Sequence, residues 1–432
     1  MLTAFIRAFR TPDLRKKLLF TVFIVAVFRL GQQLPTPGVS ESAVNFCTGV
    51  AKNSSVLQLV NLFSGNALTK LTVFALGIMP YITASIILQL LAVVIPRLET
   101  LRQEGQSGQA KITQYTRYLT VGLAILQSTG IIALARSGNL IPGCSRNLIP
   151  SPTIFTITTM VIIMTAGTAV IMWLGELITD RGIGNGMSIM IFTQIIAVVP
   201  SQLWSIYQDK HALTFALVLI MAVVLIAFIA FMEQAQRRIP IQYAKRMVGR
   251  RMYGGTSTYI PLKVNQAGVI PVIFASSLLY IPQLAAQLFH PNATSGWAFW
   301  IQNNLVFSDH AAYVISYFVL IMFFTYFYVS ITFNPTEVAD NMKKNGGFIP
   351  GIRPGGPTAG YLSHVLSRLT AAGSLYLGLV ALIPLVAVSL LNANAQFPLG
   401  GTSILIMVGV GLDTVKQLES QLQQRNYEGF LR

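Results

Sequence analysis

The sequence predicts an all-α polytopic membrane protein, and two observations lead to this fold class. The chain has 432 residues, of which 53% are hydrophobic and only 10% are charged, whereas a soluble domain has about 25% charged residues. Uncharged runs such as Ala212 to Met232 reach the roughly 20 apolar residues that a helix needs to cross a bilayer. Soluble enzymes, disordered chains and disulfide-rich secreted domains are therefore excluded.

Apolar runs predict ten transmembrane helices, five in each half of the chain. The predicted spans are 18–33, 76–95, 118–135, 154–174, 187–207, 212–232, 267–288, 313–332, 369–391 and 402–412. An odd number per half makes the second half run in the opposite sense to the first. Although no clear internal repeat is visible, this arrangement is typical of two inverted halves. We divide the chain into an N-terminal segment (1–17), two five-helix halves (18–210 and 211–412) and a tail (413–432).

Basic residues predict the orientation of these spans. Of the 30 Lys and Arg residues, 24 lie in the N-terminal segment, in the loops on its side of the membrane or in the tail, and five lie in the opposite loops. Loops rich in Lys and Arg remain in the cytoplasm, so both termini are expected there. Two loops on this side, 233–266 and 333–368, are long and basic.

The segment 61–95 is too long for a single span. Its first part, NLFSGNALTKLTVF, is polar and broken by glycine, and its second part is a good span. We therefore expect a re-entrant half-helix from Phe63 to Leu71, with an interfacial helix as the alternative. Polar backbone at membrane depth is stable only where protein covers it or where it lines a water-filled cavity. The half-helix thus favours a central pore.

Chemical motifs that would indicate catalysis are missing. The four histidines occur singly and form no HExxH motif, and no Walker A loop is present. Near the span ends we find only two acids, Glu176 and Asp413, and expect Glu176 to pair with Arg181 or to be solvated. Ion-coupled transport uses acids inside the spans, so a passive channel is favoured over a secondary transporter and over an intramembrane protease. We expect no enzymatic activity, no cofactor and no metal ion.

Two cysteines, Cys47 and Cys144, fall in loops predicted to lie outside the cell. An oxidising compartment permits a disulfide between them. Their distance in space does not follow from the sequence, so a disulfide and two unlinked thiols both remain open.

Several long segments resemble the SecY family. They are ALGIMPYITASIILQLL, EGQSGQAKITQYTRYLT, MWLGELITDRGIGNGMSI, YAKRMVGRRMYGGTSTYIPLKVNQAGVIPVIFASS, FNPTEVADNMKKNGGFIPGIRPG and GGTSILI, and they occur in order from about Leu14 to the last span. The resemblance implies a protein-conducting channel of the bacterial cytoplasmic membrane. It would pass secretory polypeptides through the membrane and release transmembrane segments sideways into lipid. The ribosome or the SecA ATPase would supply the energy.

The same resemblance implies further partners and four sets of functional residues. Expected partners are the small subunits SecE and SecG, SecDF, a YidC-type insertase, the translocating polypeptides and membrane lipids. An apolar ring at the waist of the pore would consist of Ile78, Ile82, Met187, Ile191, Ile273 and Ile406. A plug at about 61–72 would include Phe63, Ser64, Gly65, Asn66, Ala67 and Leu68.

The remaining two sets are a lateral gate and a docking surface. The lateral gate, between spans two and three on one side and seven and eight on the other, would include Thr83, Gln89, Gln127, Asn265 and Ser276. The docking surface for the ribosome and SecA would include Arg246, Arg250, Arg251, Lys343, Lys344 and Arg353. For these basic residues the alternative is that they only fix topology and contact anionic lipid headgroups.

The ring also has a physical rationale. Ile78 and Ile82 are four residues apart and share one face of a helix, as do Met187 and Ile191. Apolar side chains offer water no hydrogen bonds, so such a ring gates by dewetting. Met187 departs from the branched residue usual at its position, but methionine is flexible enough to fill the same space.

Overall fold

Ten long helices form the body of the protein, and each overlaps one predicted span. The computed structural model describes residues 9, 11–50, 65, 67–136, 138, 148–150, 152–209, 212–243, 246–248, 251–253, 257–289, 296–305, 310–390 and 401–428. The ten helices are α2 (Pro12–Gly31), α5 (Met79–Val94), α7 (Gln106–Arg136), α8 (Ile154–Arg181), α9 (Gly186–Asp209), α10 (Ala212–Gln234), α11 (Ile270–Phe289), α13 (Ala311–Thr332), α15 (Gly356–Leu390) and α16 (Gly401–Glu428). Within the described residues, five helices are by themselves long and apolar enough to cross a membrane.

The order in which the helices pack is the same in both halves. In the first half α5 packs on α7, α7 on α8 and α8 on α9; in the second half α11 packs on α13, α13 on α15 and α15 on α16. The halves meet where α11 contacts α5 and α7, and where α9 contacts α10 and α16. The prediction of two five-helix halves is therefore confirmed.

Several helices continue beyond the predicted spans. Helix α7 begins at Gln106 and α15 begins at Gly356, well before the apolar runs that were predicted to start at 118 and 369, and α16 continues into the predicted tail. Apolarity marks the part of a helix that lies in lipid, whereas the helix itself ends at a backbone break. The breaks before α7 and α15 are Gly105 (φ +74°) and Gly355 (φ +108°), in a backbone region that glycine adopts readily.

Helix α5 is followed after a sharp bend by the short helix α6 (Pro96–Gln103). The axes of α5 and α6 differ by 105°. Ile95, at the bend, has an extended backbone (φ −99°, ψ 109°), because the ring of Pro96 disfavours helical geometry in the preceding residue. The bend directs α6 across the surface, toward the second half.

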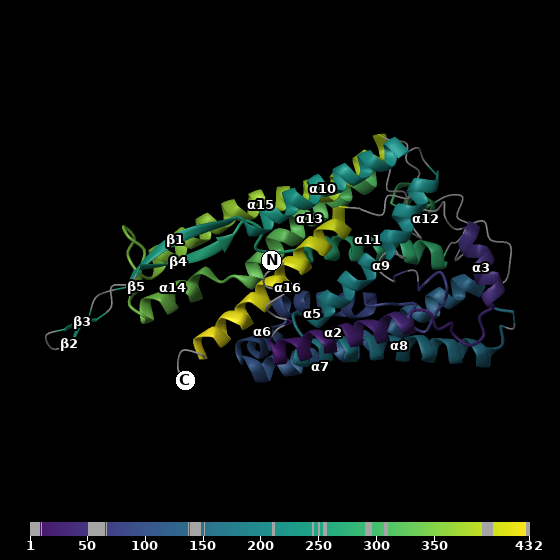
Figure 1. The fold of residues 1–432 in the computed structure, drawn as a ribbon, viewed down its shortest axis with the longest axis horizontal. Coiled ribbons are helices and arrows are strands. Elements are labelled where there is room, and N and C mark those ends of the chain that lie inside the picture. Colours follow the sequence, from purple (N-terminus) through teal and green to yellow (C-terminus); the bar gives the residue numbers. More distant parts are fainter. Residues whose placement is uncertain are drawn as a thin grey trace.

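Two long loops predicted to be cytoplasmic fold together into one small unit. Strand β1 (Gln236–Tyr243) pairs antiparallel with β4 (Ser257–Lys263) on one side and with β5 (Gly347–Phe348) on the other. Helix α14 (Pro335–Lys344) and the start of α15 pack against this sheet through the buried residues Ile241, Met342 and Leu362. Strands β2 (Arg246–Val248) and β3 (Arg251–Tyr253) extend the hairpin away from the body (Figure 1). The sequence analysis predicted loops here and missed the strands.

The segments predicted for the two sides of the membrane lie at opposite ends of the molecule. The β-hairpin, α14 and α6 lie at one end, and α3 (Glu41–Val50) and α12 (Trp297–Asn304) lie at the other (Figure 1).

Cys47 in α3 is fully buried and is disulfide-bonded. The alternative of an unlinked thiol is therefore wrong for Cys47; Cys144, the other cysteine of the sequence, lies outside the described residues.

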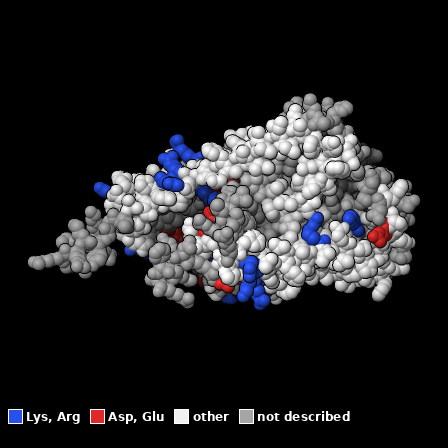
Figure 2. Space-filling model, viewed as in Figure 1, with Lys and Arg blue, Asp and Glu red and all other residues white. Residues whose placement is uncertain are grey.

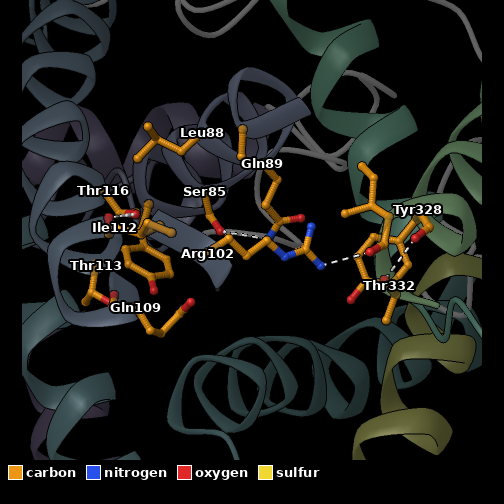
Figure 3. A pocket seen from close by; sticks show the side chains of 13 residues that line it. Ser85, Leu88, Gln89, Arg102, Gln109, Ile112, Thr113, Thr116, Tyr328 and Thr332 are labelled. Atoms are coloured by element: carbon orange, nitrogen blue, oxygen red, sulfur yellow. Dashed lines mark hydrogen bonds between the residues drawn. The ribbon is translucent and has the colours of Figure 1, made fainter. Parts of the chain in front are cut away.

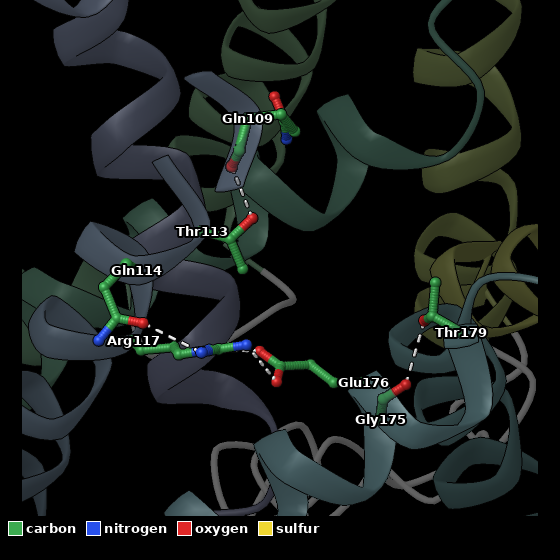
Figure 4. A network of polar contacts seen from close by, with 7 residues as sticks. All are labelled: Gln109, Thr113, Gln114, Arg117, Gly175, Glu176 and Thr179. Atoms are coloured by element: carbon green, nitrogen blue, oxygen red, sulfur yellow. Dashed lines mark hydrogen bonds and ion pairs between the residues drawn. The ribbon is translucent and has the colours of Figure 1, made fainter. Parts of the chain in front are cut away.

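A polar network joins α7 to α8. The Arg117 guanidinium donates from Nε and Nη2 to the two carboxylate oxygens of Glu176, both at 2.8 Å, and from Nη1 to Gln114 Oε1 at 3.0 Å (Figure 4). The expected pairing of Glu176 with Arg181 is thus wrong. Residues five apart on a helix do not face each other, whereas the neighbouring helix α7 places Arg117 at the level of Glu176.

This ion pair predicts a measurable coupling between α7 and α8. In a double-mutant cycle with Arg117→Met and Glu176→Gln, we expect a coupling free energy of about 1 kcal/mol, because the pair is bidentate and only partly exposed. The free energy of unfolding in detergent would measure it. The control pair Lys111–Glu104 is longer, at 3.7 Å, and more exposed, so its coupling should be close to zero. Equal coupling in both pairs would contradict this account.

Candidate functional site

The six residues predicted for the apolar ring all belong to one large hydrophobic cluster or pack against it. Ile82 lies on α5, Ile191 on α9, Ile273 on α11 and Ile406 on α16, so each half contributes two helices. All five isoleucines belong to one buried cluster, against which Met187 packs. Ile78 and Ile406 are 1% exposed, and the other three isoleucines are 7–8% exposed. The cluster contains residues of both halves, so it is compatible with a ring of these six residues, which remains a prediction.

Small residues let the start of α9 approach this cluster closely. A Cβ atom at Gly186 would lie 1.8 Å from the Gly175 carbonyl oxygen, and one at Gly175 would lie 2.2 Å from Met187 Sδ. Any larger side chain at either position would push α8 and α9 apart. The flexible thioether of Met187 fills the space next to Gly175. Packing against Gly175 therefore explains why methionine suits position 187.

The segment before α5 is compact but not helical. The described part of the predicted half-helix, Gly65 and 67–71, lies in turns, with positive φ at Gly65 (+64°) and Leu71 (+47°). Helical hydrogen bonding is replaced here by contacts with the chain that follows α2: Thr36 N donates to Leu71 O, and Val73 N donates to Leu34 O. The predicted half-helix is therefore wrong for these residues, while Phe63, Ser64 and Asn66 lie outside the described residues.

This segment is also firmly anchored. Leu68 and Leu71 are buried in a hydrophobic cluster with α3, α7 and α8, and Ala67 is buried as well. Lys70 Nζ donates to Gln33 Oε1 at 3.0 Å. A plug assigned to 61–72 would consequently include core residues at its C-terminal end. A deletion of the whole range would remove part of this core.

A pocket of about 260 Å³ opens between the two halves. It is lined by α5, α6 and α7 of the first half and by the end of α13 of the second half (Figure 3). Most lining side chains carry a hydroxyl or amide group, and Arg102 is the one charged residue among them. The pocket therefore marks a weakly polar seam, at the position where the lateral gate was predicted.

The five predicted gate residues do not form one cluster. Gln89 lines the pocket, where its Nε2 donates to Ser85 Oγ at 3.3 Å. Thr83 and Ser276 donate to carbonyl oxygens of their own helices, Met79 O and Ile273 O. Gln127 is partly buried on α7. The helices that carry these residues are neighbours, but the polar side chains are satisfied separately.

The fifth residue, Asn265, has a partner that the sequence analysis missed. Its Nδ2 donates to Glu233 Oε1 and to Gly268 O. Glu233 lies at the end of α10 and is 8% exposed, so the expectation that Glu176 and Asp413 are the only acids near the span ends is wrong. In the sequence, the one sign of this buried acid was its position directly after the apolar run 212–232. Charged residues at that position are usually solvated, so burial was not expected.

The predicted docking residues lie on the unit built from the two basic loops. Lys343 and Lys344 are exposed in the last turn of α14, and Arg353 is exposed in the turn before α15. Arg246 and Arg251 lie in β2 and β3, and Arg250 lies outside the described residues. On the face shown in Figure 2, Lys and Arg gather mostly toward this end of the molecule.

Comparisons with known proteins agree with this architecture. The sequence model of the SecY family matches residues 72–415. The protein translocase subunit SecY of Streptomyces scabiei is 66% identical over 439 residues, and that of Mycobacterium bovis is 58% identical over 441 residues. Both alignments cover 100% of this chain and 100% of the relative.

Solved structures show the same fold at low sequence identity. A protein-conducting channel superposes with a TM-score of 0.64 and 18% identity, covering 94% of this chain and 91% of that one. A second structure, of a SecY protein whose plug domain stabilises the closed state and maintains a membrane seal, has a TM-score of 0.62 and 19% identity over the same shares. Sec61 in a canine ribosome–channel complex has a TM-score of 0.60 and 17% identity, covering 94% and 91%. By its sequence, matched over its full length, the chain belongs to the SecY family.

Proposed function

We propose that this chain is the channel-forming subunit of a bacterial protein translocase. The observation that carries the proposal is the buried hydrophobic cluster to which both halves contribute apolar side chains, among them the five isoleucines of the proposed ring. A ring without hydrogen-bonding groups excludes water when it is closed. It also surrounds a passing polypeptide without binding any particular side chain, as a channel for many substrates requires.

The seam between the halves is the proposed lateral exit. It separates α5 and α7 from α11 and α13, and its pocket is lined by hydroxyl, amide and aliphatic groups and by Arg102. A transmembrane segment entering the seam would exchange these weakly polar surroundings for lipid. Each Leu or Ile then contributes only about −0.3 to −0.6 kcal/mol to the transfer into lipid. Whether a segment leaves the channel therefore depends on the sum over the whole segment.

The plug is proposed to begin before the anchored segment. Residues 67–73 are held by the core and by hydrogen bonds to 34–36, so a movable plug belongs to the preceding residues, with Gly65 near its base. The plug domain of the related SecY structure stabilises the closed state of its channel. That role is consistent with a plug whose C-terminal end is anchored at residues 67–73.

The β-hairpin unit is the proposed docking surface for a motor or the ribosome. The related Sec61 and Ssh1 structures are in complexes with ribosomes. The hairpin here projects from the helical body and carries Arg246 and Arg251 near its tip (Figure 1), and Lys343, Lys344 and Arg353 lie on the same unit. Basic residues bind RNA phosphates with a strong salt dependence, and guanidinium groups also bind carboxylates of a protein partner such as SecA. The small subunits SecE and SecG are further proposed partners, as are SecDF and a YidC-type insertase.

The orientation of the chain is part of this proposal. The basic unit would face the cytoplasm, with both termini on the same side of the bacterial cytoplasmic membrane. The excess of Lys and Arg on that side supports it, as does the separation of the two sets of loops at opposite ends of the molecule (Figure 1).

Reconstitution tests the function directly. Vesicles containing the chain, the two small subunits and a motor should make a secretory precursor resistant to added protease, and detergent should abolish the resistance. Vesicles without the chain are the control. A precursor that stays fully digestible in the complete vesicles would refute the proposed function.

The ring predicts the ion permeability of the resting channel. Ile82→Ser or Ile191→Ser should raise the resting conductance in planar bilayers several-fold, because a hydroxyl lets water enter the constriction. The matched control is Ile125→Ser on α7, where the side chain is 47% exposed. The assignment fails if the ring variants conduct no more than the control.

The docking surface predicts a loss of ribosome binding and of motor-driven transport. Arg250→Glu with Arg251→Glu should weaken ribosome binding and lower the slope of log affinity against log salt by about two, one for each lost phosphate contact. Arg353→Glu should stall SecA-driven transport while the protein still inserts. Arg136→Glu, at the opposite end, is the control for net charge. If the docking variants behave like this control, the basic residues serve topology alone.

A further inference from the structure

A charged side chain, that of Arg102, bonds across the seam between the two halves. Arg102, near the end of α6, donates from Nη2 to the carbonyl oxygen of Ile331 in α13 at 2.9 Å (Figure 3). The two residues are 229 positions apart in the chain. The bend of 105° after α5 gives α6 the direction that makes this contact possible.

The acceptor is well suited to a guanidinium group. Ile331 lies in the last turn of α13, which ends at Thr332, and the last four carbonyl groups of a helix have no partner within that helix. The C-terminus of a helix also carries partial negative charge. Because the last turn of α13 contains no basic residue of its own, Arg102 supplies the stabilising cation from the other half.

Several other polar groups of the pocket bond within their own helices. Gln89 bonds to Ser85 on α5, Thr113 donates to Gln109 O on α7, and Thr332 donates to Tyr328 O on α13. These groups keep their hydrogen bonds when the helices move apart. The bond from Arg102 is broken by the same movement, so opening of the seam has to overcome it.

We propose that Arg102 is a specificity-determining latch. It sets how favourably the apolar targeting segment of a precursor must bind in the seam before the two halves separate there. The inference rests on the proposed function, because it assigns a role to Arg102 in lateral opening. A segment with a full apolar stretch opens the seam despite the latch. A segment with a shorter or less apolar stretch does not open the seam, so the latch helps the channel to reject its precursor.

Transport of two precursors tests the latch. In the reconstituted complex, Arg102→Met should raise protease protection of a precursor with a weakened targeting segment about five-fold, the factor that corresponds to about 1 kcal/mol. Transport of a precursor with an intact segment should stay unchanged. Arg97→Met on the same helix is the matched control, since Arg97 is exposed on α6 and does not line the pocket. Arg102→Lys, which keeps the charge near α13, should restore part of the rejection.

A distance measurement separates failure of the latch from failure of the proposed function. Spin labels at Ala110 on α7 and Asp340 on α14, both exposed, report the width of the seam without any precursor. Arg102→Met should broaden the distance distribution toward longer values, whereas Arg97→Met should not. An unchanged distribution together with unchanged rejection overturns the latch, even where the intact precursor is transported. A broadened distribution supports the latch even where neither precursor is transported, and that result counts against the proposed function alone.

Discussion

The contact between apolar side chains of the two halves is the interaction on which the rest of the structure depends. Ile78 and Ile82 from the first half meet Ile273 and Ile406 from the second in one buried cluster. Helices in lipid gain little from burying apolar surface against each other, because lipid tails are equally apolar. At the centre of a channel the alternative neighbour is water. Burial there is consequently favourable, and the same apolar cluster holds the halves together.

Polar contacts serve a different purpose, since most of them stabilise each half internally. Arg117 and Glu176 join α7 to α8 in the first half. In the second half Asn265 bonds to Glu233, and Lys263 lies 3.8 Å from Asp413. Between the halves, in the part of the chain that the structure describes, the contacts are mainly apolar, with the bond from Arg102 to α13 at the edge. Polar bonds within the halves and mainly apolar contacts between them are what the proposed lateral exit at the seam requires.

The sequence predicted those parts of the fold that depend on composition alone. Ten apolar runs mark the membrane helices, and motif context placed Met187, Ile191 and the other ring residues in one cluster. Features that depend on distant partners were missed. Glu176 pairs with Arg117 on another helix rather than with nearby Arg181, and residues 67–72 take their shape from hydrogen bonds to the chain after α2.

The hairpin and the helix ends were missed for other physical reasons. In β1 the burial of Ile239 and Ile241 alternates with exposed residues, but the signal covers a few positions inside a basic loop. Helices α7 and α15 continue in polar sequence, where hydropathy carries no information about helix ends. A local break decides the end instead, such as the positive φ at Gly105 or Gly355.

Apolar packing at the centre and one charged bond at the rim suit a channel that must accept many different sequences. A ring of isoleucines and one methionine makes no hydrogen bonds, so its free energy of opening depends little on which residues pass through it. Selection therefore has to take place elsewhere, at a contact that the entering segment must displace. The proposed latch at the pocket has that property, because Gln89 and the threonines of the pocket bond within their own helices, whereas Arg102 bonds across the seam. Translocation that is independent of sequence and selection of the entering segment thus belong to separate parts of the proposed channel. Either property can therefore change without altering the other.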